Sequence, residues 1–229
     1  MQGMTELDVL NQVSGAMQRY AAEVFRLQQD EEQVSLSHLA EHVDSSPQAI
    51  SRMIKRLTDG GYATYEPYRG VRLTEAGERI AMPSLRRHRL SEVFLVQVMG
   101  YDWADAHELT DTFELGVNED LEDRMSELTG NPTRCPHGEP IPTKEGVIQF
   151  PDDEPLVKQE AGVRCRLSRV RTHAYDKLRD VAKLGLTPGT EFTLVSQAPF
   201  RGPLRLKFER GDQVIGYELA ASLWIEVLD

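Results

Sequence analysis

A short helix, a turn, a longer helix and an alternating segment follow one another within residues 35–73, and this order strongly limits the folds open to the chain. Ser35 is placed to cap the first helix, "SLSHLAEHV", and Pro47 to begin the second, "PQAISRMIKRLTDGG", at a position where proline fits. The Gly60–Gly61 pair ends that helix, and "YATYEPYRGVRLT" then alternates like a β-hairpin. The segment has the outline of a winged helix-turn-helix.

The second helix of such a motif turns its N-terminal residues toward base edges in the major groove. A Gln can bond adenine through two hydrogen bonds, an Arg can bond guanine, and a small Ala leaves room for a thymine methyl group. The candidates for base contacts are Ser46, Gln48, Ala49, Ser51 and Arg52. Further along the helix and at the hairpin tip, the candidates for phosphate contacts are Lys55, Arg56 and Arg69. The alternative is an ordinary helical pair with a solvated basic face.

Charge is unevenly distributed along the 229 residues, whose formal net charge is −11. Residues 47–90 hold nine Lys or Arg against four acids, whereas residues 91–131 hold eleven acids and one Arg. The overall charge argues against a general polyanion binder, but the basic segment suits phosphate and the acidic one suits cations. The chain has no apolar run of the ~20 residues that a membrane helix needs, and its N-terminus lacks the features of a signal peptide. A cytoplasmic protein without a membrane partner is expected.

Helical spacing of apolar residues predicts a long helix over residues 4–29, another from Thr74 to Gly100, and two more at "WADAHELTDTFELGV" and "NEDLEDRMSEL". A proline-rich loop and linker follows. Four short strands are then expected at "GVRCRLSRV", "EFTLVSQA", "LRLKF" and "LWIEVL", with one helix at "AYDKLRDVAKLGL". This pattern predicts a mainly α protein with a small β-barrel-like domain at its C-terminus.

Histidines and carboxylates share faces on two of the predicted helices. His88 and Glu92 are four residues apart, and His107, Asp111 and Glu114 follow at spacings of four and three. The "GYDWAD" turn between antiparallel helices would bring these faces together, and such a mixture of ligands suits Mn²⁺, Fe²⁺, Co²⁺ or Zn²⁺. The carboxylates favour a hard ion such as Mn²⁺. The alternative is a solvated acidic face with histidines covered by neighbouring arginines.

The segment "TRCPHGEP" places Cys135 one residue from His137 on a loop that follows the helices. With Glu92 or a residue of the C-terminal domain, this pair could form a second, softer metal site. The alternative is a connector pinned by proline, with a small buried cysteine. Cys135 and Cys165 are too few for a disulfide framework, although a single disulfide between them is compatible with the sequence.

Four motifs, in chain order, resemble those of the diphtheria toxin repressor and manganese transport regulator family. The segment "SLSHLAEHVDSSPQAISRMIKRLTDGGYATYEPYRGVRLTEAGERI" is similar to the family's winged helix, and "RRHRLSEVFLV" to its dimerisation signature. The loop "CPHGEPIP" and the segment "KLRDVAKLGLTPGTEFTLV" resemble the inter-domain loop and the start of the SH3-like third domain. The resemblance implies a winged helix-turn-helix domain at 1–76, a helical metal-binding and dimerisation domain at 77–150, and an SH3-like, FeoA-like domain at 151–229.

The resemblance also implies metal ligands. One family site matches His88, Glu92 and His107, and in the branch that carries "CPHG" another matches Cys135, His137 and Glu92, with His173 as a weak and Asp176 as a weaker further candidate. A further family site would use Asp111 and Glu114. Leu115 stands where that site has a His, and Arg19 stands where it has an N-terminal ligand. An Arg cannot bind a metal, so Arg19 is expected to pair with Asp111 or Glu114 instead.

These observations together predict a homodimeric, metal-dependent transcriptional regulator rather than an enzyme, with a palindromic double-stranded DNA operator and no small-molecule substrate. Mn²⁺ is the expected metal, with Fe²⁺, Co²⁺, Zn²⁺ and Cd²⁺ as alternatives. Two other classes of protein are compatible with some of these residues. A metallohydrolase would use His88, Glu92 and His107, and a metal-trafficking module would leave Gln48 and Arg52 without a role.

Overall fold

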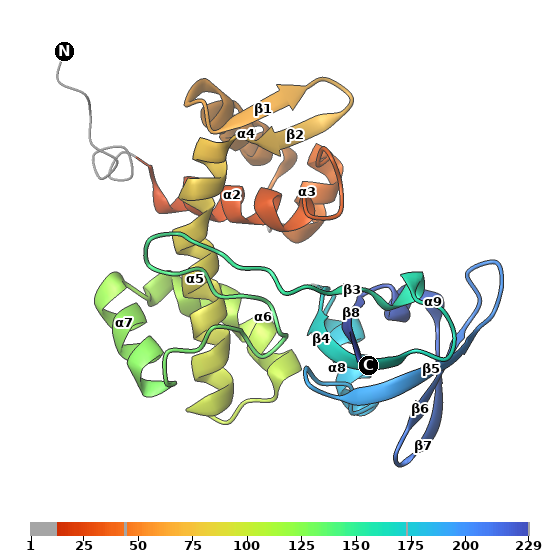
Figure 1. Cartoon of the computed structure of the whole chain (residues 1–229). Coiled ribbons are helices and arrows are strands. Elements are labelled where there is room, and N and C mark those ends of the chain that lie inside the picture. Colours follow the sequence, from red (N-terminus) through yellow and green to blue (C-terminus); the bar gives the residue numbers. More distant parts are fainter. Residues whose placement is uncertain (1–12, 44, 173, 229) are drawn as a thin grey trace. The chain divides into compact units, whose positions relative to one another are not determined.

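The computed structural model describes residues 13–43, 45–172 and 174–228. The chain divides into two compact units, one of residues 1–87 with 142–147 and the other of residues 88–141 with 148–229. The long helix α5 (Glu75–Gln97) begins in the first unit and continues in the second (Figure 1). The long helix expected from Thr74 is therefore confirmed.

The first unit contains the helix, turn, helix and hairpin that the sequence predicts. Ser35 accepts a hydrogen bond from the His38 amide, and Ser46 accepts one from the Ala49 amide, so both helices of the pair are capped. Residues 4–12 of the helix expected over 4–29 lie outside the described residues, and the described helix begins at Gly15. The elements before α5 are α2 (Gly15–Leu27), α3 (Leu36–His42), α4 (Pro47–Asp59), β1 (Ala63–Glu66) and β2 (Gly70–Leu73).

The hairpin of β1 and β2 is fastened to the segment before α3. The two strands pair antiparallel, and Val71 exchanges backbone hydrogen bonds with Val34. Gly70 adopts φ +134°, and a Cβ at this position would collide with the carbonyl oxygen of Val34. A glycine is therefore required here both by the backbone conformation and by the close approach of the two segments.

Helix α4 has one buried and one exposed face. Ile50, Ile54 and Leu57 are almost completely buried, at the spacings of four and three that place residues on one side of a helix. The side chains of Gln48 and Arg52 lie on the exposed side. Burial of the apolar stripe therefore fixes which polar residues α4 presents to solvent.

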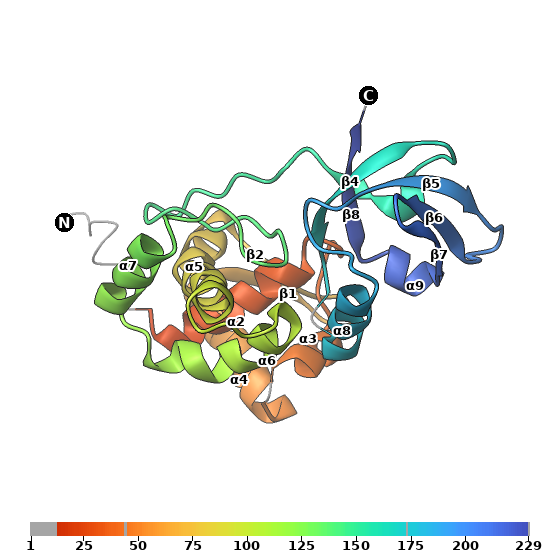
Figure 2. The same ribbon diagram turned by 90° about the horizontal axis from the view of Figure 1, so that it is seen from below.

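The helices of the second unit surround the C-terminal half of α5. Figure 2 looks nearly along α5 and shows α6 and α7 beside it. The helices predicted at "WADAHELTDTFELGV" and "NEDLEDRMSEL" are both present, although the first ends in a short 3₁₀ turn. These elements are α6 (Trp103–Phe113), η1 (Glu114–Gly116) and α7 (Glu119–Leu128).

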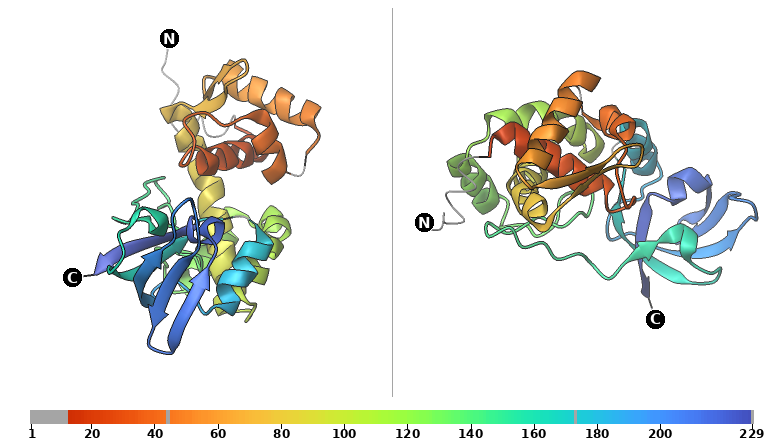
Figure 3. Two further views of the ribbon diagram at one scale, coloured as in Figure 1. Left: turned by 90° about the vertical axis from the view of Figure 1, so that its right-hand side faces the viewer. Right: turned by 90° about the horizontal axis from the view of Figure 1, so that it is seen from above.

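The rest of the second unit contains an antiparallel six-stranded sheet with the order β3-β8-β4-β5-β6-β7. Figure 3 shows this blue part of the chain from two further sides. The four predicted strands and the predicted helix are confirmed, whereas β3, β7 and α9 were not predicted. Among the described residues no pairing joins the edge strands β3 and β7, so the sheet is open rather than a closed barrel. The elements are β3 (Glu154–Pro155), η2 (Leu156–Lys158), β4 (Arg164–Val170), α8 (Tyr175–Lys183), β5 (Glu191–Gln197), β6 (Leu204–Phe208), β7 (Gly211–Ile215), α9 (Tyr217–Ala220) and β8 (Leu223–Leu228).

The sheet and the start of α6 share one hydrophobic core. Trp103 and Ala104 of α6 pack with buried residues of the sheet, among them Leu167, Leu194 and Leu223. Burial of this apolar surface holds the first turn of α6 firmly against the sheet. None of the described helices is both long enough and apolar enough to cross a bilayer.

Candidate metal centre and nucleic-acid interface

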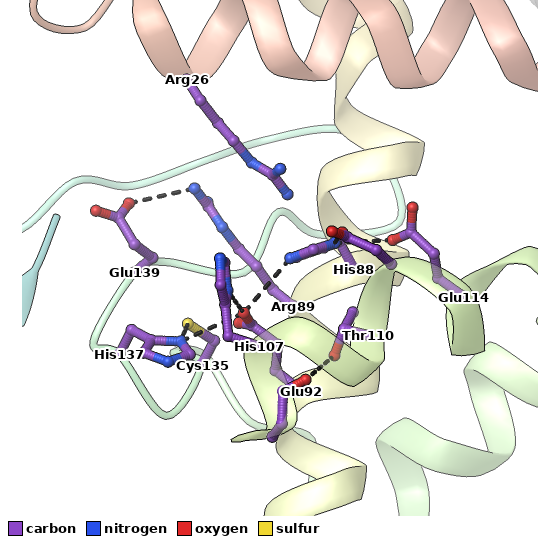
Figure 4. A network of polar contacts seen from close by, with 12 residues as sticks. Arg26, His88, Arg89, Glu92, His107, Thr110, Glu114, Cys135, His137 and Glu139 are labelled. Carbon is purple, nitrogen blue, oxygen red and sulfur yellow. Dashed lines mark hydrogen bonds and ion pairs between the residues drawn. The ribbon is translucent and has the colours of Figure 1, made fainter. Parts of the chain in front are cut away.

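One carboxylate oxygen stands at the centre of the predicted metal-binding residues. Oε1 of Glu92 lies 2.8 Å from Nδ1 of His107, 3.3 Å from Nδ1 of His137 and 3.4 Å from Nε2 of His88. Figure 4 shows Cys135 and His137 on one side of Glu92, and His88 and Glu114 on the other. The helical spacing of His88 and Glu92 and the antiparallel course of α6 bring these side chains together, as the sequence predicts.

Two groups of side chains within the described residues have the spacing of metal ligands. The first is His88, Glu92 and His107, and the second is Glu92, Cys135 and His137. In each group the donor atoms lie within 4.8 Å of one another. Glu92 belongs to both groups, so the two sets are neighbours that share one carboxylate.

The loop that carries Cys135 and His137 is closed by its own backbone. The Cys135 amide donates to the carbonyl of Glu139, and the Gly138 amide donates to the carbonyl of Cys135. Gly138 has φ +86°, a conformation that glycine adopts easily, and it turns the loop sharply after Pro136 and His137. As a result Sγ of Cys135 lies 3.8 Å from Nδ1 of His137.

A backbone group that sequence inspection did not identify orients His137. Nε2 of His137 lies 3.0 Å from the carbonyl oxygen of Trp103, which can only accept a hydrogen bond. Nε2 therefore carries a proton that it donates to this oxygen, and Nδ1 is the nitrogen that faces Glu92 and Cys135. No side-chain signal could have revealed this contact, because it depends on a main-chain oxygen.

Asp111 and Glu114 have different surroundings. The buried Glu114 carboxylate accepts a hydrogen bond from His88, with Oε2 2.9 Å from Nδ1. Asp111 Oδ1 is 3.8 Å from the same nitrogen, but the Asp111 side chain is 77% exposed. Leu115, at the position of a family ligand, is also exposed. The predicted pair of Arg19 with Asp111 or Glu114 stays a prediction, because Arg19 lies on α2 in the other unit.

Two weaker candidate ligands and a possible disulfide were also predicted in this part of the chain. His173 lies outside the described residues. Asp176 is exposed at the start of α8. Cys135 and Cys165 are both buried and free, so the disulfide between them does not form.

Burial and close neighbours perturb the acid–base properties of the cluster. Burial by itself raises the pKa of Glu92, but the surrounding histidines outweigh this effect and hold the pKa well below its usual range. Burial lowers the pKa of His107 and raises the pKa of Cys135 well above its usual range. An ionised carboxylate packed among imidazoles and a thiol, all buried except the partly exposed His107, is a donor set that fits a divalent transition-metal ion.

The predicted DNA-contacting residues lie mainly on the exposed side of α4 and on the hairpin. Ser46, Gln48, Ser51 and Arg52 are exposed, while Ala49 is half-buried. Lys55 forms an ion pair with Asp59, and Arg69 forms one with Glu66. Such exposed pairs contribute little free energy, so both cations remain available to a phosphate. Arg56 points its guanidinium toward the sulfur of Met17.

Three family models match consecutive parts of the chain. "Iron dependent repressor, N-terminal DNA binding domain" matches residues 12–71, "Iron dependent repressor, metal binding and dimerisation domain" matches residues 74–143, and "FeoA domain" matches residues 155–227. The order of these matches follows the order of the motifs along the chain.

Individual relatives agree with these matches. The iron-dependent repressor IdeR of Mycobacterium tuberculosis is 31% identical over 153 residues, which cover 65% of this chain and 66% of that protein, just under two thirds of its length. The diphtheria toxin repressor of Corynebacterium efficiens is 22% identical over 78% of this chain and 82% of its own length. Both are described as repressors, which favours a regulator over a metallohydrolase.

Solved structures extend the likeness to the whole fold. A manganese-dependent transcriptional repressor in complex with manganese superposes with a TM-score of 0.85 and 28% identity, over 93% of this chain and all of that one. IdeR of T. acidophilum shares the fold with a TM-score of 0.81 at 24% identity over the full length of both chains. The matches therefore show that the chain belongs to the diphtheria toxin repressor and manganese transport regulator family of metal-dependent transcriptional repressors, which are not enzymes.

Proposed function

We propose that this protein is a cytoplasmic, metal-responsive regulator that binds a palindromic operator as a homodimer and controls metal-homeostasis genes. The observation that carries the proposal is the gathering of three histidines around Oε1 of Glu92 in a chain that also has a helix-turn-helix. The family membership supports it, since the relatives are repressors. We also propose the division into domains 1–76, 77–150 and 151–229.

The proposed ligands are the two groups that share Glu92, namely His88, Glu92 and His107, and Glu92, Cys135 and His137. Asp111 and Glu114 are proposed as further ligands and His173 as a weak one. Imidazole, carboxylate and thiolate donors suit first-row transition metals and Cd²⁺. Mn²⁺ is the proposed physiological ion because a relative forms a complex with manganese. Fe²⁺, Co²⁺, Zn²⁺ and Cd²⁺ are alternatives, and structures of ScaR with Zn²⁺ and Cd²⁺ support the last two.

Contacts within the chain already orient the proposed ligands in the absence of an ion. The Trp103 carbonyl holds the ring of His137 with Nδ1 toward the cluster, and burial keeps the Cys135 thiol protonated. When bound, a divalent ion supplies the positive charge that Glu92 and the Cys135 thiolate require once the ligands have lost their protons. A homodimer whose two recognition helices are held at the spacing of two half-sites would then bind its operator tightly.

The proposal is tested by measuring binding to promoter DNA of a metal-transporter gene, with Mn²⁺ and with chelator. We expect Mn²⁺ to tighten binding by about 5–150-fold, the usual range of allosteric coupling. Cys135→Ala should reduce this stimulation and leave metal-independent binding intact. Cys165→Ala is the matched control, because Cys165 is also buried and free but lies in the core of the C-terminal sheet.

Two results would contradict the proposal. Binding to this DNA that is the same with Mn²⁺, Fe²⁺ or chelator would exclude metal-dependent regulation. Equal loss of stimulation in both cysteine variants would show that Cys135 acts through packing rather than through the metal.

A further inference from the structure

Glu139, two residues beyond His137, lies among three arginines. Its carboxylate is 3.2 Å from a guanidinium nitrogen of Arg89, 3.3 Å from one of Arg169 and 3.8 Å from Nε of Arg171. The side chains of all three arginines are at most 10% exposed. Figure 4 shows the contact between Arg89 and Glu139 close to the side chains of Cys135 and His137.

These arginines come from both sides of the loop. Arg89 follows His88 on α5, and besides Glu139 it donates a hydrogen bond to the carbonyl of Pro140. Arg169 belongs to β4 of the C-terminal sheet, and Arg171 follows that strand. Glu139 therefore connects the helix that carries two proposed ligands with the C-terminal sheet.

The arginine on the sheet side is itself rigidly held. Arg169 donates two hydrogen bonds of 2.8 Å to the carboxylate of Asp153. Its guanidinium lies 4.5 Å from the ring centre of Trp224, and that of Arg171 lies at the same distance from this ring. The guanidiniums of Arg169 and Arg171 are thus held in place on the sheet, and their ion pairs with Glu139 restrict the movement of the loop.

The backbone of the loop is in equally close contact with β4. The Val170 amide donates to the carbonyl of His137 over 2.8 Å. A Cβ added at Gly138 would collide with the carbonyl oxygen of Ser168. A displacement of the C-terminal sheet must therefore also move the backbone of the loop that carries Cys135 and His137.

We propose that Glu139 is a positioning residue that holds the Cys135–His137 loop in its metal-binding shape and couples metal binding there to the seating of the C-terminal domain. The inference rests on the proposed function, because it takes Cys135 and His137 as ligands. Without the Glu139 charge, the buried arginines repel one another. The loop keeps its hydrogen bonds from Arg89 and Val170 but loses its ion pairs with α5 and β4.

The test is a titration with Cd²⁺, followed by the ultraviolet charge-transfer band of a cadmium–thiolate bond, in wild type, Glu139→Gln and Asp153→Asn. We expect Glu139→Gln to weaken Cd²⁺ binding at the thiolate by about 10–100-fold, the usual effect of losing an outer-shell partner. Asp153→Asn is the matched control, because it also removes a carboxylate charge from Arg169, while the Trp224 ring and the Glu139 carboxylate still hold that arginine in place. It should lower thermal stability and leave the Cd²⁺ affinity unchanged.

Unchanged Cd²⁺ affinity in Glu139→Gln, or an equal loss in Asp153→Asn, would overturn the inference and leave the proposed metal site intact. Absence of the band in wild type would overturn the role of Cys135 as a ligand and the inference with it. If Glu139→Gln does not fold, as judged by circular dichroism, Arg89→Lys keeps the charge but removes the guanidinium that reaches both Glu139 and the Pro140 carbonyl. Weakened Cd²⁺ binding in Arg89→Lys then supports the inference, and wild-type binding contradicts it.

Discussion

At the scale of single residues, Glu92 is the group on which the site depends. One of its carboxylate oxygens lies within 3.4 Å of a nitrogen of each of three histidines, and the residue is 2% exposed. A buried carboxylate of this kind is stable only while its positive or hydrogen-bonding partners remain. Metal-free protein must obtain this compensation from the histidines around Glu92, and protonation of either Glu92 or His107 disturbs it.

The metal-free protein should lose stability as the pH falls. The pKa of His107 is lowered on folding, so the unfolded chain takes up this proton more readily once the pH drops below about 6.5. The pKa of Glu92 is also lowered, so the unfolded carboxyl protonates first, from about 4.5 downward, and stability falls further. We expect denaturant midpoints, measured with chelator, to fall between about pH 7 and pH 5.

A variant of His107 tests the origin of this pH dependence. His107→Gln should reduce the loss of stability between these pH values relative to wild type. Stability that rises toward pH 5 would show that the folded state binds more protons than the unfolded one, contrary to the lowered pKa values.

Two single substitutions on α4 should distinguish residues that contact bases from residues that contact phosphates. Arg52→Ala should cost about 1–3 kcal/mol of binding free energy at the operator and relax its specificity. Lys55→Ala should weaken operator and unrelated DNA alike and flatten the dependence on salt. Fluorescence anisotropy with operator and scrambled duplexes measures both. If neither variant changes binding, α4 is not the recognition helix.

At the scale of elements, local sequence signals placed the helices and strands well. The caps at Ser35 and Ser46 and the apolar period of α4 depend on neighbours three or four residues away, so they can be identified without knowledge of the fold. The short elements β3, β7 and α9 were missed because their few residues lack a clear period. β3 has only two residues and exists through its pairing with β8.

The hairpin offers a prediction at this scale. Gly70→Ala should destabilise the protein by more than the roughly 1–3 kcal/mol expected from backbone strain, because the added Cβ is strained at this φ and also collides with Val34. Gly211→Ala is the control, since Gly211 has φ +123° but no atom within 4 Å of its added Cβ. Thermal unfolding should show a larger loss for Gly70→Ala. Equal losses would mean that backbone strain alone accounts for the effect.

At the scale of the whole molecule, metal and DNA should act on one equilibrium. If both bind best to the same dimer geometry, each must tighten the other by the same factor. We expect Mn²⁺ affinity, measured by calorimetry, to rise when operator DNA is present, by the factor by which Mn²⁺ tightens DNA binding. A scrambled duplex at the same concentration is the control. A metal affinity that is indifferent to operator would rule out this coupling.

The sequence by itself determined the order of motifs, the helices and the identity of most of the proposed ligands. Spacings such as His88 to Glu92 act within one helix turn, and the turn between α5 and α6 is short, so local geometry was sufficient to bring these residues together. The same signals indicated the helix-turn-helix and its exposed Gln48 and Arg52. The family resemblance rested on these segments, and the matches confirmed it.

Only the tertiary structure decided how these residues share their partners. Glu92 serves both ligand groups through one oxygen, Glu114 turns to His88 while Asp111 faces solvent, and Glu139 meets arginines from α5 and β4. The longest of these contacts, between Arg89 and Glu139, joins residues 50 positions apart, at a distance set by the packing of several elements. No periodicity encodes such distances, because each depends on how the buried surfaces of separate segments fit together.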